Sequence, residues 1–128
     1  MIEFMTSPLA ILCYQKLFPG SQMVNRLEDL AYRVEVLNDA SQLARFTRQM
    51  KPMVVLVDMD SSGYDVASEI SSLRETTETA HIPVLAFAAG DNAEGQEAAR
   101  SAGARLVASE DAILDQLPSL LDHVLDLN

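Results

Sequence analysis

The stretch KPMVVLVDMDSSGYD, residues 51 to 65, contains the most strand-like run of the chain. Its centre, Met53 to Val57, is apolar, β-branched and uninterrupted, as expected of a strand buried on both faces of a parallel sheet. Asp58 follows directly, and Ser61, Ser62 and Gly63 are typical of a turn. The stretch therefore predicts a central parallel strand with a carboxylate at its carboxyl end.

Strand-length apolar runs alternate with segments of helical period on both sides of this stretch. The alternation predicts βαβ units, and hence a parallel sheet with helices on both faces. The other strands are predicted at residues 9–14, 34–37, 82–87 and 106–108. Helices are predicted to begin at an N-cap Ser21 and near Ser41, to cover 66–73, 92–102 and 110–127, and to kink or restart at Pro118.

Five strand–helix repeats in 128 residues predict one α/β domain, which we place at residues 9–128 after an N-terminal tail at residues 1–8. Cys13 is the only cysteine and lies inside an apolar run, so we expect a buried thiol in a reducing compartment. That run is too short for a signal peptide or a membrane span. The sequence therefore predicts a cytoplasmic protein without membrane contact.

Charge is unevenly distributed along the chain, whose net charge is −10. Residues 1–53 hold six Lys and Arg against five Asp and Glu, whereas residues 54–128 hold three against fourteen. Binding to nucleic-acid phosphates requires a basic footprint, so the acidic half argues against a nucleic-acid partner. Ordinary solubility and a basic protein partner both agree with this charge.

The segment around Asp58 resembles the phospho-accepting segment of receiver domains in two-component response regulators. Three further segments match the same family at the expected intervals: LEDLAYRVEV at 27–36, IPVL at 82–85 and AGA at 102–104. The resemblance covers nearly the whole chain from Leu9 onward. It implies a single (βα)5 flavodoxin-like domain whose functional residues follow the carboxyl ends of the strands.

The metal site of the family is only partly present. Receivers bind Mg²⁺ through the phospho-accepting aspartate, two acidic residues after the first strand, and a backbone carbonyl two positions beyond that aspartate. Asp58 and the carbonyl of Asp60 match this pattern, but the acidic pair falls at Gln15 and Lys16. The resemblance therefore implies weak Mg²⁺ binding at best, and we expect no metal site and no other cofactor.

Two other groups of the family are also replaced. The Thr or Ser after the fourth strand falls at Ala88, and the lysine after the fifth strand falls at Ser109 or, with a shift of one residue, at Glu110. Because phosphoryl transfer depends on positioning and charge stabilisation, these losses predict a crippled reaction at Asp58. We hypothesise that Lys16, by reaching toward Asp58, partly replaces both the metal and the lysine.

These departures favour a stand-alone pseudo-receiver of a two-component or phosphorelay-type system, non-enzymatic and acting by protein–protein contact. Its candidate partners are another signalling protein, with a basic surface as one option, and a second copy bound through the last helix. An acidic ridge is predicted on that helix, formed by Asp111, Asp115, Asp122 and Asp126.

Two alternative functions remain open. The first is a working response regulator that accepts a phosphoryl group on Asp58. The second is a flavodoxin-like small-molecule binder, for which the segment Gln15 to Gly20 offers little of the required phosphate-binding loop.

Overall fold

The computed structural model describes residues 7–14, 17–60 and 65–126, and these form a five-stranded sheet of order β2-β1-β3-β4-β5. All four neighbouring strand pairs are parallel, which confirms the predicted α/β architecture. The strands are β1 (Leu9–Cys13), β2 (Arg33–Leu37), β3 (Val54–Asp58), β4 (Val84–Ala88) and β5 (Leu106–Ser109).

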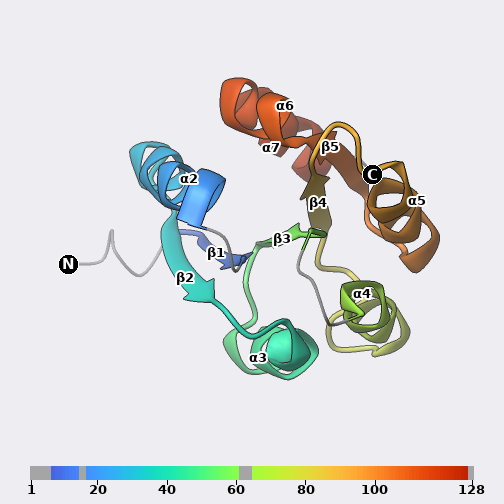
Figure 1. Ribbon diagram of the computed structural model, residues 1–128. Helices are drawn as coiled ribbons and strands as arrows, with labels where there is room; N and C mark the ends of the chain where they lie inside the picture. Colours follow the sequence, from blue (N-terminus) through green and yellow to red (C-terminus); the bar gives the residue numbers. More distant parts are fainter. Residues whose placement is uncertain (1–6, 15–16, 61–64, 127–128) are drawn as a thin grey trace.

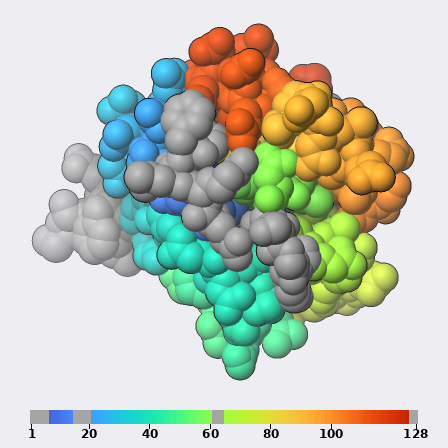
Figure 2. Space-filling view, in the orientation of Figure 1, coloured from blue at the N-terminus to red at the C-terminus, as the bar shows by residue number. Residues whose placement is uncertain are grey.

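Helices cover both faces of the sheet (Figure 1). They are α2 (Leu17–Asp29), α3 (Leu43–Met50), α4 (Val66–Glu75), α5 (Ala93–Ala102), α6 (Glu110–Asp115) and α7 (Leu117–Asp126), with a short 3₁₀ helix η1 (Ala40–Gln42) before α3. One face of the sheet packs against α2, α6 and α7, and the other against α3, α4 and α5. Figure 2 shows that helices of both layers form much of the outer surface.

Two apolar cores lie on the two faces of the sheet. Every residue of β1, β3 and β4 is buried, so these strands are central, whereas the edge strand β2 is partly exposed. Successive side chains of a strand point to opposite faces. Leu56 and Phe87 accordingly lie in the core beneath α2, α6 and α7, and Val55 and Val57 lie in the core beneath α3, α4 and α5.

The helix boundaries follow the predictions with one exception. Ser21, predicted as an N-cap, lies inside α2, which begins at Leu17. Pro19 is tolerated in this first turn because the first amide groups of a helix have no helical acceptor. The predicted restart near Pro118 is confirmed, since α6 ends at Asp115 and α7 begins at Leu117.

The acidic ridge predicted for one continuous helix is therefore divided between two helices. Three of its carboxylates are exposed, on α6 and on α7: Asp111, Asp115 and Asp122. The structure describes the backbone of Asp126 but not its side chain. The opposite, apolar side of these helices is buried in the core, through Ile113, Leu117, Leu121 and Val124. In the part of the chain that the structure describes, no helix has the length and apolar character that crossing a membrane requires.

Candidate functional site

The predicted site residues lie where strands end, along one edge of the sheet. Asp58 is the last residue of β3 and pairs in register with Phe87 of β4. Ala88 ends β4 and pairs with Ser109, which ends β5. Because all these strands are parallel, their ends meet at the same edge, and the fold brings Asp58, Ala88 and Ser109 to it. Gln15 and Lys16 lie outside the described residues, so contact between Lys16 and Asp58 stays a hypothesis.

The carboxylate of Asp58 is buried and bonded to its own turn. The residue is 1% exposed, and its Oδ1 atom accepts the backbone N–H of Asp60 at 2.9 Å. This is the geometry by which an aspartate stabilises a turn two residues further along the chain. Burial of a carboxylate is costly unless hydrogen bonds compensate it, so the bond fixes both Asp58 and the start of the loop.

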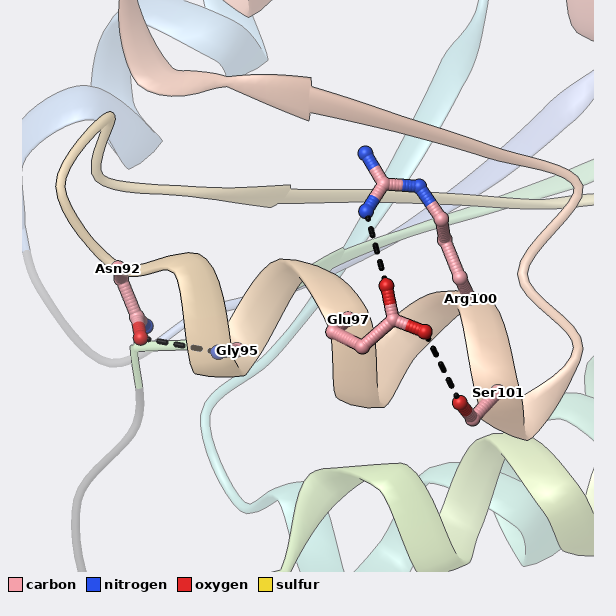
Figure 3. A network of polar contacts seen from close by, with 5 residues as sticks. All are labelled: Asn92, Gly95, Glu97, Arg100 and Ser101. Atoms are coloured by element: carbon pink, nitrogen blue, oxygen red, sulfur yellow. Dashed lines mark hydrogen bonds and ion pairs between the residues drawn. The ribbon is translucent and has the colours of Figure 1, made fainter.

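Asp60 connects the loop after β3 to the loop after β4. Its Oδ2 atom accepts the backbone N–H of Ala89 at 2.8 Å, and its Oδ1 atom accepts the side-chain Nδ2 of Asn92 at 2.6 Å. Asn92 in turn accepts the backbone N–H of Gly95 at 2.9 Å and so caps α5 (Figure 3). The sequence assigned only the carbonyl of Asp60 to the site, and this role of its side chain was missed.

The other predicted positions that the structure describes, Ala88, Ser109 and Glu110, have no basic side chain. Ala88 is fully buried and has only a methyl group. Ser109 is the N-cap of α6, where its hydroxyl accepts the backbone N–H of Ala112 at 3.2 Å. Glu110 lies in the first turn of α6, where the helix dipole favours a negative charge. Ser109 and Glu110 therefore have clear local roles at the start of a helix.

Cys13 ends β1 near the same edge and is a free, buried thiol, as predicted. Burial raises the pKa of this thiol to about 12, with further contributions from the negative charges of Asp58, Asp39 and Glu69. Since the thiolate is the reactive form of cysteine, the thiol is inert near neutral pH. Within the described residues, no three His, Cys, Asp or Glu side chains are grouped so as to hold a metal ion.

No family model matches this sequence, and no curated protein matches it either. Several solved structures with a similar fold are receiver domains or response regulators. The receiver domain of the sensor histidine kinase PA1611 from Pseudomonas aeruginosa, determined with magnesium in its active-site cleft, has a TM-score of 0.84 and 18% identity, covering 95% of this chain and 100% of that one.

Two further receivers show the same similarity. The chemotaxis protein CheY4 of Vibrio cholerae has a TM-score of 0.80 and 15% identity, over 94% of this chain and 100% of that one. A LuxR-family response regulator from Aurantimonas has a TM-score of 0.79 and 17% identity, over 94% and 86%. At such identities the comparison concerns the fold. The chain therefore has the receiver fold of two-component response regulators.

Proposed function

We propose that this chain is a degenerate receiver, with residues 9–128 as its domain, that signals by binding another protein without Mg²⁺-dependent aspartyl phosphorylation. The observation that carries the proposal is the state of Asp58. This phosphoacceptor-like residue is 1% exposed, and one of its oxygens is engaged by the backbone of Asp60. A phosphoryl donor would have to reach a carboxylate that is buried and already bonded.

The chemistry of the neighbouring groups supports the proposal. Phosphoryl transfer needs groups that stabilise the charge of the transition state, and one such group typically contributes roughly 3 kcal/mol. By the sequence resemblance, the methyl group of Ala88 falls where receivers have a hydroxyl, and Ser109 or, with a shift of one residue, Glu110 falls where they have a lysine. We expect transfer to Asp58 to be slower by several orders of magnitude than in a complete receiver.

The described residues also fit a magnesium ion poorly. Mg²⁺ requires near-octahedral coordination by oxygen, and it is usually held by more than one carboxylate. The Asp60 carboxylate is already bonded to Ala89 and Asn92, which leaves Asp58 and the carbonyl of Asp60 among the described groups. We infer that the protein works without a metal or other cofactor.

A basic protein surface is the partner that the charge distribution favours. Both α5 and α6 contact the edge strand β5, from opposite faces of the sheet. Among the side chains that the structure describes, exposed carboxylates on α5, α6, α7 and the loop before α5 are those of Asp91, Glu94, Glu97, Asp111, Asp115 and Asp122. Arg100 is exposed in the same region and forms an ion pair with Glu97 at 3.4 Å (Figure 3). Complementary charge on a partner would speed association and select against acidic proteins.

A homodimer through the last helices is less favoured than a basic partner. The apolar side of α6 and α7 is already buried in the core of the same chain. A two-fold contact through the outer side would place the same surface on both copies, so the carboxylates of Asp111, Asp115 and Asp122 would face the same acidic patch of the other copy. Like charges in such a contact oppose association.

Incubation with Mg²⁺ and acetyl phosphate, followed by intact-mass measurement, tests the proposal. We expect no phosphoryl adduct under conditions that phosphorylate a complete receiver, which serves as the control for the donor. A stable adduct on the wild type that is absent from Asp58→Asn would establish the phospho-accepting alternative. A thermal shift with FMN would instead support a small-molecule binder.

A further inference from the structure

We propose that an Asp60–Asn92 bridge holds the loop between β4 and α5 in one conformation. The bridge consists of the Asp60 carboxylate, the Ala89 N–H, the Asn92 side chain and the space left by Gly95. The Asp60 carboxylate supplies the acceptor oxygens that bond this loop. The inference rests on the proposed function and deepens it, because a permanently fixed loop provides one binding surface without phosphorylation.

The hydrogen bonds at Asp60 join two loops that are distant in sequence. Asp60 reaches Ala89 across 29 residues and Asn92 across 32 residues, with distances of 2.8 and 2.6 Å. Hydrogen bonds that involve a charged group are shorter and stronger than neutral ones. The neighbouring backbone is held as well, because the N–H of Met59 bonds the carbonyl of Phe87 at 2.8 Å. The bridge therefore starts from a fixed position on β3.

The orientation of the Asn92 amide is determined by its two partners. Its Oδ1 atom accepts the N–H of Gly95 as the N-cap of α5, so its Nδ2 atom faces Asp60. The loop is closed on itself by two further bonds to the carbonyl of Ala89, from the backbone N–H of Asn92 at 3.0 Å and from the side-chain Nε2 of Gln96 at 3.2 Å. Loss of the Asp60 carboxylate would leave the Ala89 N–H and the Asn92 amide without this acceptor.

Gly95 makes room for the bridge. A Cβ atom at this position would lie 2.4 Å from Nδ2 and 2.9 Å from Cγ of Asn92, so any side chain there would displace the Asn92 amide. Glycine is otherwise unfavourable inside a helix compared with alanine. The presence of Gly95 in α5 is thus explained by the space that Asn92 requires.

Hydrogen exchange of the Ala89 amide, measured by NMR, tests the bridge directly. In Asp60→Ala we expect this exchange to be faster by about tenfold or more, the effect of losing a hydrogen bond to a charged acceptor. Asp39→Ala is the matched control, because Asp39 also follows a strand but its carboxylate, among the described residues, bonds Ser41 in its own turn. Equal protection of the Ala89 amide in Asp60→Ala and the wild type would overturn the proposal.

Gly95→Ala provides a second test in which helix propensity and the bridge predict opposite signs. In the wild type we expect Gly95→Ala to lower Tm, because the added Cβ displaces Asn92. In an Asn92→Ala background the same substitution should raise Tm, because only helix propensity then acts. An increase of Tm in both backgrounds would contradict the bridge.

The two proposals fail separately. A phosphoryl adduct on Asp58 together with faster Ala89 exchange in Asp60→Ala would reject the phosphorylation-independent function and retain the bridge. Unchanged Ala89 exchange in Asp60→Ala, together with no phosphoryl adduct on the wild type, would reject the bridge and retain the phosphorylation-independent function.

Discussion

Glu69 of α4 accepts the backbone N–H of Ala44 in the first turn of α3, with 2.9 Å between its Oε1 atom and the amide nitrogen. The N-cap residue of α3, Gln42, makes no side-chain bond of this kind. The first amide groups of a helix need acceptors from outside the helix, and here a neighbouring helix supplies one.

Glu69→Ala should therefore destabilise the fold by about 1–2 kcal/mol, as the loss of a helix cap does. Glu69→Gln retains an acceptor oxygen and should have a smaller effect. Urea denaturation measures both, with Glu75→Ala as the control, since Glu75 is exposed at the end of the same helix. A free energy of unfolding unchanged in Glu69→Ala would show that the bond contributes nothing to stability.

Gly103 and Gly90 differ in how well each position can accommodate a side chain. Gly103 ends α5 with a φ of +111°, and a Cβ there would lie 2.6 Å from Cγ of Arg74, whereas a Cβ at Gly90 meets nothing within 4 Å. Gly103→Ala should cost at least roughly 1–2 kcal/mol from the left-handed backbone alone. Gly90→Ala should be neutral or stabilise by up to about 1 kcal/mol through the unfolded state. Similar effects of the two substitutions in thermal unfolding would contradict this assignment.

Because Cys13 is a buried thiol, we expect the folded protein to lose stability at alkaline pH. Its pKa is raised, mainly by burial, from 9.0 to about 12, so above pH 9 the unfolded chain releases this proton while the folded chain keeps it. The free energy of unfolding must then fall as pH rises, by up to about 1.4 kcal/mol per pH unit from this group. Well below pH 9 the thiol is neutral in both states and contributes no pH dependence.

Urea unfolding of the wild type and Cys13→Ala between pH 8 and about 11 isolates this effect, because all other titrating groups are shared. The wild type should lose stability more steeply than the variant above pH 9, the ordinary pKa of the thiol. Parallel pH profiles for the two proteins would show that the thiol ionises equally in both states.

Ser109 should act as a helix cap. Ser109→Ala removes the acceptor for the Ala112 N–H and should cost about 1 kcal/mol. Ser109→Asp should retain most of the stability, because aspartate is an equally good N-cap. Ser101→Ala, on the exposed side of α5, is the control (Figure 3). Chemical denaturation measures the free energy of unfolding of each variant. Equal values for Ser109→Ala and Ser101→Ala would show that Ser109 does not stabilise α6 as a cap.

Local patterns were enough to predict most of the fold. The run Met53 to Val57 predicts a central buried strand because only a strand covered on both faces takes apolar residues at every position. Gly103 predicts the end of α5, since glycine readily adopts the left-handed backbone found there. Ser21 misled the prediction of α2, because a serine inside a helix cannot be distinguished by its sequence alone from one that begins it.

The sequence by itself determined the order of strands and helices and the position of Asp58 at the carboxyl end of β3. Only the tertiary structure decided which polar groups meet. The hydrogen bonds that Ala89 donates to Asp60 and that Ala44 donates to Glu69 join residues 29 and 25 positions apart. Residue periodicity reports the burial of a side chain within its own helix or strand, whereas these contacts depend on how separate segments pack around the sheet.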